Sequence, residues 1–389
     1  MNGGFWKRWA PPLALLLIFL LFVVRLNRVD KVPLVVRQGQ SFEKGVVTAV
    51  LQDNLQADGS RVGQQVVRIR MTTGTLAGEE LETTSSSGFL FGAPCTVGMK
   101  VVVMQSVAGD TAVTSVYSRD RGTAICVFGL LYLLVLCLVG GWQGVKGALG
   151  LAFTFGCILF VYLPLIYRGG SPFWTAVLVC VITTAVTLYL IGGPTRKTLA
   201  ATGGTVAGVI IAGAAASLFS LATGVTGWNV SDIESLLTLW NTADVQVGGL
   251  LFSGLLISSL GATMDVAMSI SSSMAELLEQ NPDLSRGALF QAGMRVGRDM
   301  MGTDSNTLIL AFAGGSVSML VMDYAYDLPW LQIINSNNIG IAVMQGLSGS
   351  FGVVLSVPAT VLLAAFLYTG RRKDKGFDKA AGLPYNQEV

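Results

Sequence analysis

The chain has 389 residues, of which 52% are apolar and only 12% are charged. Soluble globular proteins carry about 25% charged residues, so this composition excludes an ordinary soluble protein and a disordered chain. It is typical of a protein that crosses a membrane several times. The formal net charge of +2 gives no electrostatic reason to expect a nucleic-acid partner.

The chain contains no histidine. This excludes catalysis by Ser-His-Asp or Cys-His sets and excludes histidine ligands to zinc or haem. The phosphate-binding pattern G-x-x-x-x-G-K-[ST] does not occur either. Four of the five cysteines lie in apolar runs, where we interpret them as small buried hydrophobes. We therefore expect neither an enzyme nor a resident metal or cofactor.

An apolar run over residues 9–24 resembles a signal peptide, because Lys7 and Arg8 precede it. Arg25 follows the run directly, and no small-residue cleavage site is evident. We interpret residues 1–30 as an uncleaved N-terminal anchor helix.

Residues 42–118 form a more polar region in which apolar and polar side chains alternate. Turn signals such as Asp58-Gly59 separate the alternating runs. Short strands with this spacing predict a small antiparallel β-barrel of OB-like size. Its few aromatic residues do not form the stacking platform of a nucleic-acid-binding barrel. The alternating runs cover residues 46–50, 66–70, 101–103 and 113–117.

From residue 123 almost to its end the chain is apolar, and seven further membrane spans are predicted. With the anchor, the fold is that of a polytopic α-helical membrane protein with about eight transmembrane helices. The predicted helical domain, 122–369, includes a cytoplasmic helical segment over 267–305, and a tail follows over 370–389. The seven spans are 123–141, 147–167, 173–192, 198–222, 246–264, 306–322 and 339–369.

Basic residues in short loops predict the orientation in the membrane. If the chain crosses the membrane eight times, Lys146, Arg196 and Lys197 all fall on the same side as Lys7. The basic tail that begins at Arg371 falls there too. Both termini are therefore expected in the cytoplasm, with the β-barrel on the opposite, extracytoplasmic side.

The predicted span 198–222 carries a small residue at every fourth position. Residues four apart share one helix face, and small side chains let a second backbone approach closely. This face packs either inside the chain or at a subunit interface. The predicted helix-packing residues are Gly204, Gly208, Ala212, Ala216 and Ser220.

A polar stripe begins near the end of the span 246–264. Asp265, Ser269, Ser272 and Glu276 follow at steps of four, three and four, which places them on one helix face. After Asn281-Pro282 comes a second helical stretch, which proline at the turn would allow to fold back beside the first. It carries Arg295, Arg298 and Asp299, and Asn306 follows at the start of the next span.

An ionisable residue at membrane depth is usually functional. One interpretation of this region is a substrate or ion path, formed by Asp265, Ser269, Glu276, Arg295, Arg298, Asp299 and Asn306. The other is a solvated interfacial helix with structural pairs. We expect Asp265 to find a cation or to open to water. Arg298 is the preferred partner, because guanidinium groups match carboxylates and stay charged. Arg295 and Asp299 form a second expected pair, four residues apart.

Several segments resemble the YibE/F-like family of bacterial membrane proteins, and the chain resembles a YibE-like member. The resemblance covers residues 259–270, 281–285, 293–310 and 349–358. It implies an anchor helix, an extracytoplasmic β region and a multi-span body in the bacterial plasma membrane. It also implies a related YibF-like partner or a homo-oligomer. Ala342 and Gln345 stand where the family leads us to expect charged residues, so no charged site is transferred there.

Two functions compete on this evidence. The first is a secondary transporter or channel for a small solute or ion, because irregular spans and ionisable residues occur together. The alternative is a non-transporting envelope scaffold or accessory subunit, whose β domain binds a partner outside the membrane.

Overall fold

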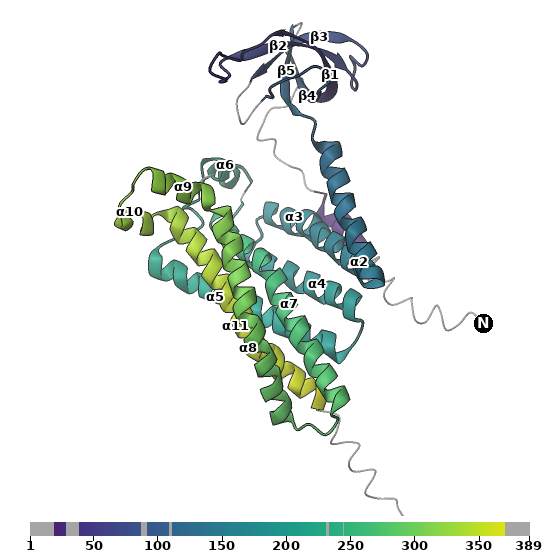
Figure 1. Ribbon diagram of the computed structural model, residues 1–389, viewed down its shortest axis with the longest axis vertical. Coiled ribbons are helices and arrows are strands. Elements are labelled where there is room, and N and C mark those ends of the chain that lie inside the picture. The colour runs from purple at the N-terminus through teal and green to yellow at the C-terminus, as the bar shows by residue number, and fades with distance from the viewer. Residues whose placement is uncertain are drawn as a thin grey trace, which may run out of the picture. The chain divides into compact units, whose positions relative to one another are not determined.

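The computed structural model describes residues 19–28, 39–86, 92–108, 111–230, 233–243 and 245–369 (Figure 1). The chain divides into two compact units. One unit comprises Pro33–Leu138, and the other comprises Met1–Val32 together with Val139–Val389. Most of the predicted anchor and all of the predicted tail lie outside the described residues.

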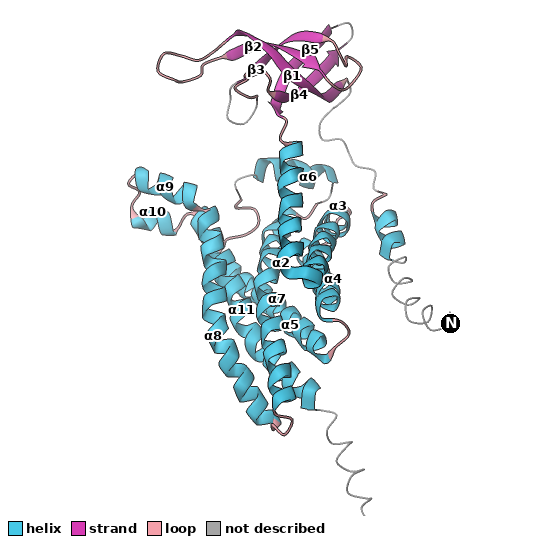
Figure 2. Ribbon diagram, turned by 45° about the vertical axis from the view of Figure 1, so that its right-hand side comes forward, coloured by secondary structure: helices cyan, strands magenta, loops and turns pink. Residues whose placement is uncertain are grey.

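The first unit contains a closed barrel of five strands, drawn in magenta in Figure 2. Four of the five strand pairings are antiparallel, whereas β3 pairs with β5 in parallel. The small barrel that the alternation predicts is therefore confirmed, with one parallel pairing that was not expected. The strands are β1 (Gln40–Gln52), β2 (Gln64–Met71), β3 (Glu80–Ser86), β4 (Lys100–Ala108) and β5 (Thr111–Arg119).

The inward side chains of the barrel follow the period of two. Val67, Ile69 and Met71 on β2 are fully buried, as are Val101 and Val103 on β4. Alternate residues of a strand point to one face, so these side chains fill the barrel while their neighbours face outward. The alternation in the sequence thus fixes which face of each strand becomes core.

The second unit is helical. In the described part of the chain five helices are long and apolar enough to cross a membrane, or six if one bent pair counts as a span. The elements are α2 (Gly122–Cys157), η1 (Ile158–Tyr162), α3 (Leu163–Tyr167), α4 (Pro172–Gly192), α5 (Arg196–Thr223), α6 (Ile233–Ala243), η2 (Val247–Gly249), α7 (Leu250–Gln280), α8 (Arg286–Gly315), α9 (Val317–Ala325), α10 (Trp330–Ile334) and α11 (Asn337–Thr369).

Helix breaks do not all fall where the hydropathy predicts them. Gly141 interrupts α2 with φ 53° and ψ −133°, which agrees with the end of the predicted span 123–141. A positive φ of this size is one that glycine adopts without steric cost. In contrast, α7 and α8 run unbroken through both ends of the predicted cytoplasmic segment 267–305. The break after α8 is a bend of 58° into α9.

Helices α5, α7, α8 and α11 run side by side in both ribbon views (Figures 1 and 2). The small residues of α5 allow this packing, because α11 crosses them at close range. A Cβ atom on Gly204 would lie 1.8 Å from Thr360 Oγ1, and one on Gly208 would lie 2.9 Å from the Gly352 carbonyl oxygen. Ala212 and Ala216 are fully buried in the same helical unit. Of the two alternatives for this face, the structure therefore supports packing inside one chain at these positions.

The two ends of the helical unit differ. Helices α6, α9 and α10 gather at one end, where Gly340 of α11 lies beside Val225 (Figure 1). The turn between α7 and α8 lies at the other end, where Arg286 donates a hydrogen bond to Thr369 Oγ1 at 2.8 Å. We call these the α6–α10 end and the α7–α8 turn end.

Candidate functional site

The predicted fold-back of the two polar stretches is confirmed. The turn at 281–285 joins α7 to α8, and Ser285 caps α8 by accepting a hydrogen bond from the Ala288 amide. Along the contact, a Cβ atom on Gly293 would lie 2.6 Å from Met274 Sδ, and one on Gly297 would lie 3.2 Å from Ile270 Cδ1. Glycine thus brings the two helices together at this end.

The charged side chains on these helices do not pair as the sequence predicts. In the described chain all four ion pairs lie in or beside the barrel, so neither Asp265–Arg298 nor Arg295–Asp299 forms. Both predicted pairings are wrong for this structure. Ser269 is half-buried, and the other predicted path residues are exposed: Asp265, Glu276, Arg295, Arg298, Asp299 and Asn306.

Asp304 is a further acidic residue, two positions before the predicted path residue Asn306. It is half-buried on α8, between the packed positions Gly297 and Leu308 on the same side of the helix. Next to it, Ser305 has a buried hydroxyl without a hydrogen-bond partner in the structure. Asp304 is not among the predicted path residues. Asp304 follows Gly297 by seven residues, which is about two helical turns, so both lie on the same face of α8. Because Gly297 packs against neighbouring helices, this spacing could have indicated that Asp304 faces them too.

The two carboxylates, of Asp265 and Asp304, lie far from either end of the helical unit, measured along the helices. Ser271, six residues beyond Asp265, donates a hydrogen bond to the Lys197 carbonyl oxygen at the start of α5. Six helical residues correspond to about 9 Å. On the other side, Ser350 of α11 donates to the Ser305 carbonyl oxygen at 3.3 Å. Asp265 and Asp304 are therefore level with the inner parts of α5 and α11.

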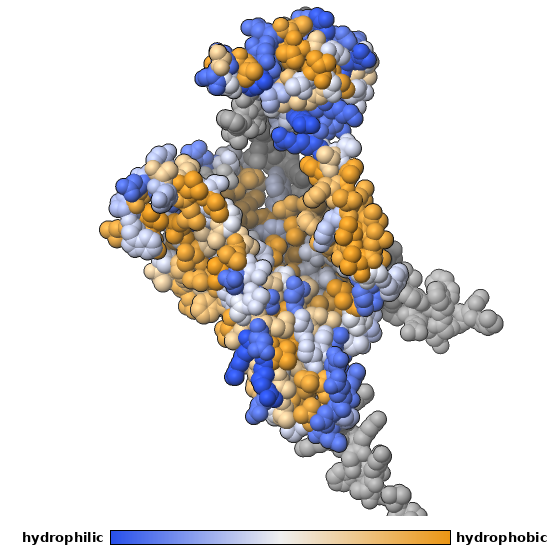
Figure 3. Space-filling view, viewed as in Figure 1, coloured by the Kyte–Doolittle hydropathy of each residue, from blue (hydrophilic) through white to orange (hydrophobic). Residues whose placement is uncertain are grey.

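The exposed side of α7 at this level lacks large apolar residues. From Leu250 to Ala275, the exposed residues of α7 are Gly254, Ser258, Gly261 and Asp265, which we call the α7 stripe. The exposed residues of α8 before Ile309 are likewise polar or glycine. On α5, by contrast, Ile210 is 52% exposed, and on α11 Phe351 is 56% exposed. Figure 3 shows pale and blue residues over α7 and α8 between orange areas.

An open cleft of about 780 Å³ lies near the α7–α8 turn end. Arg196 and Lys197 line it from α5, and Glu276 and Glu279 line it from α7. Glu276 is thus a predicted path residue that the structure places in a cleft with basic side chains.

A second open cleft, of about 690 Å³, lies at the α6–α10 end. It surrounds the bend after α8 and contains Ser316, Asp323, Asn338 and Gln345 among its lining residues. Gln345 therefore lies in a cleft whose lining mixes polar side chains with apolar ones such as Met319 and Ile341.

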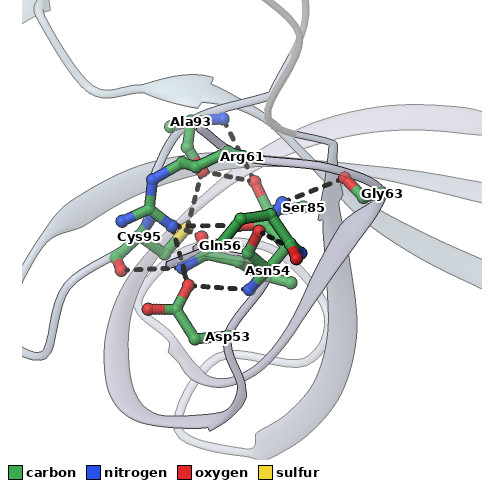
Figure 4. A network of polar contacts seen from close by, with 9 residues as sticks. Asp53, Asn54, Gln56, Arg61, Gly63, Ser85, Ala93 and Cys95 are labelled. Atoms are coloured by element: carbon green, nitrogen blue, oxygen red, sulfur yellow. Dashed lines mark hydrogen bonds and ion pairs between the residues drawn. The ribbon is translucent and has the colours of Figure 1, made fainter. Parts of the chain in front are cut away.

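The barrel holds a separate polar network, shown in Figure 4. Arg61 Nη1 lies 2.7 Å from Asp53 Oδ1, and Gln65 Nε2 donates to the same oxygen at 2.8 Å. Gln65 also accepts a hydrogen bond from the Cys95 amide at 2.7 Å. These bonds tie the β1–β2 loop to the segment before β4. Burial raises the pKa of the Cys95 thiol, which keeps it protonated and unreactive at neutral pH.

Two carboxylates should make the barrel sensitive to acid. The hydrogen bond from Gln65 lowers the pKa of Asp53, and the hydrogen bond from Lys44 lowers the pKa of Asp120. A lowered pKa in the folded state adds stability above the ordinary pKa of about 3.9, which is lost as the pH falls through the lowered value. We expect pepsin to cleave the barrel of the full chain increasingly below about pH 4.

The measurement is the cleavage rate at each pH, normalised to an unfolded reference peptide. In the double variant Asp53→Asn and Asp120→Asn, the rate should depend less on pH. An unchanged pH dependence in this variant would show that other groups control acid unfolding.

Comparison with known proteins gives one match. A family model described as YibE/F-like protein matches residues 128–370, which is more than half of the chain and runs from within α2 to the end of α11. The barrel lies outside the matched range. Searches of curated proteins and of solved structures found no match.

Proposed function

Because this chain belongs to the YibE/F-like family and carries long apolar helices, it is a membrane protein, and we propose that it transports a small solute or ion. The proposed route follows the α7 stripe and the neighbouring polar side of α8. Asp265 and Asp304 are the proposed site along it.

The observation that carries this proposal is the composition of the α7 stripe. Lipid chains cannot hydrogen-bond or solvate a carboxylate, so a charged residue on a membrane helix normally faces a cavity, water or a partner charge. Asp265 has no ion-pair partner in the described chain, and no large apolar side chain of α7 is exposed around it. Water along the stripe would solvate Asp265 and provide a path.

The charges favour a positively charged solute. When both carboxyl groups are ionised, Asp304 would act on Asp265 as a like charge, and a bound cation or proton would relieve that repulsion. In the described residues, Arg295 and Arg298 form no ion pair with either carboxylate. We therefore propose a small cation, the proton included, as the transported or coupling ion.

The bend after α8 supports the same function. Non-helical backbone at membrane depth is tolerated where it is buried in protein or lines a watery cavity. Here the bend of 58° lines the cleft that contains Asp323, Asn338 and Gln345. This cleft would serve as the entrance to the route at the α6–α10 end.

The proposed orientation places the α7–α8 turn and both termini in the cytoplasm, and the barrel outside a bacterial plasma membrane. It predicts that Thr75→Cys in the barrel and Asp283→Cys in the α7–α8 turn are labelled from opposite sides. Both positions are exposed. Labelling by a membrane-impermeant maleimide in intact cells and in inverted vesicles measures this. Labelling of both positions from one side would contradict the orientation.

Flux into vesicles tests transport itself. Purified protein in liposomes would be challenged in turn with gradients of protons, Na⁺, K⁺ and Mg²⁺, while a dye inside reports each ion. We expect flux of at least one of these cations above that of empty liposomes. Flux equal to that of empty liposomes for every gradient would contradict cation transport and favour the scaffold role of the barrel.

A further inference from the structure

Helix α9 has two different faces. Ser318, Met319, Met322 and Asp323 line the cleft at the α6–α10 end. Four of the remaining five positions form an apolar row at steps of three, one and three, which is one face of a helix. The row consists of Val317, Leu320, Val321 and Tyr324, all of them exposed.

Helix α10 extends this exposed apolar surface. Trp330 is 72% exposed, Leu331 is 75% exposed, and Ile334 is exposed on the same short helix. We call these three residues and the apolar row of α9 the α9–α10 surface. Large exposed apolar surfaces on a folded chain mark contact with lipid or with another protein.

The position of α9 follows from the helices beneath it. Leu308 of α8 lies against Gly349, within the middle third of α11. From Leu308 to Gly315 the helix rises about 10 Å, whereas half of the hydrocarbon thickness is about 15 Å. The bend of 58° then tilts α9 away from the direction of α8. With the middle of α11 placed at the middle of the membrane, Tyr324, Tyr326 and Trp330 fall near the level at which tyrosine and tryptophan concentrate in membrane proteins.

Helix α6 supports the same level. It lies at the same end of the helical unit, and its Trp240 packs edge-on against Trp228 at 5.5 Å between ring centroids. Trp240 is also partly exposed. Two separate segments at this end of the helical unit, α6 and α9–α10, thus expose aromatic side chains.

The surface carries no positive charge that would attract anionic lipid. Neither 224–285 nor 309–369 contains a lysine or an arginine, whereas Asp323 and Asp327 lie in or beside α9. Binding to a membrane surface therefore has to come from apolar area, and electrostatic attraction to phosphate groups cannot supply it.

We propose that the α9–α10 surface lies in the lipid headgroup region of the membrane, with its apolar row in lipid and the opposite side of α9 facing the cleft. On this proposal α9 is an interfacial helix, and α8 and α9 together are not a straight span. The inference does not depend on transport, because it concerns only which solvent each side of α9 contacts.

A matched pair of spin labels on α9 tests the proposal. In a background with Cys126→Ser and Cys137→Ser, Leu320→Cys and Ser318→Cys would each carry a nitroxide in the full chain in zwitterionic vesicles. The label at Leu320 should collide more with lipid-soluble oxygen than with a water-soluble nickel chelate. The label at Ser318, two residues away on the cleft side, should show the opposite preference.

Three results would overturn the proposal. The first is that the label at Leu320 collides more with the nickel chelate than with oxygen. The second is spin–spin broadening at Leu320, which would show that a second copy of the chain lies there. The third is that the label at Leu320 contacts lipid only when the vesicles contain anionic lipid. Val317→Cys repeats the measurement on the same row if Leu320→Cys does not fold. Equal cation flux through the protein labelled at Leu320, which does not line the cleft, and through the unmodified chain would separate failure of this proposal from failure of transport.

Discussion

Gly208→Leu is expected to destabilise the helical unit strongly. A Cβ atom at position 208 would lie 2.4 Å from Thr263 Cγ2, 2.8 Å from Ser356 Cβ and 2.9 Å from the Gly352 carbonyl oxygen. These contacts come from α7 and α11, so the new side chain would push two helices apart. Overpacking of a tight core costs about 1–3 kcal/mol, and a site closed by backbone belongs at the upper end.

The measurement is the midpoint of thermal unfolding in detergent. Unfolding is followed as the loss of monodisperse protein with rising temperature. Gly129→Leu is the matched control, because it adds the same side chain to a helix where nothing lies within 4 Å of the new Cβ atom. It should leave the midpoint unchanged. If Gly208→Leu kept the midpoint but reduced the particle mass, the α5 face would be a subunit interface after all.

Much of the fold can be read from periodicity. The barrel strands that alternate apolar and polar residues were predictable, but β3 was not, because its sequence is polar at all but one position. Its inward residues Thr83 and Ser85 are buried, and their hydroxyls donate hydrogen bonds to the carbonyl oxygens of Thr114 and Ala93. A strand whose core positions are satisfied by hydrogen bonds leaves no hydrophobic pattern to detect.

The ends of α7 and α8 were harder to predict, because a polar stretch suggests that a helix stops. Hydropathy falls after Met264 and rises again near Asn306, so composition predicts ends there. The backbone continues through both positions, because helix formation needs only internal hydrogen bonds and no continued apolar sequence. Polarity in this region marks what the helices face, and it does not mark where they stop.

The candidate site was predictable only in part. Spacing places Asp265 on one helix face with Ser269 and Glu276. In the structure all three lie on α7, where Asp265 and Glu276 are exposed and Ser269 is half-buried. Whether Arg298 pairs with Asp265 could not be predicted, because this depends on the rotation of α8 about its own axis. Close packing at Gly293 and Gly297 fixes how α8 lies against its neighbours, and in the described residues Arg298 forms no ion pair with Asp265.

Removal of the charge at Asp304 should strongly reduce cation flux. Asp304→Asn keeps the shape of the side chain and removes the charge that a cation would contact. A carboxylate and a cation 4 Å apart attract each other by about 4 kcal/mol at an effective dielectric constant of 20, and 1.4 kcal/mol corresponds to a tenfold change in binding. Even after a large discount for solvation, flux should fall at least about tenfold. Asp265→Asn should have an effect in the same direction.

Asp283→Asn provides the matched control, because it makes the same chemical change in the exposed α7–α8 turn, away from the proposed route. It should retain full flux. The unfolding midpoint of each variant separates function from folding. A loss of flux at an unchanged midpoint supports the proposed site, whereas a joint loss of flux and midpoint would make the two carboxylates structural. Full flux in both Asp304→Asn and Asp265→Asn would exclude them from the route, because a cation path through this face cannot bypass both charges.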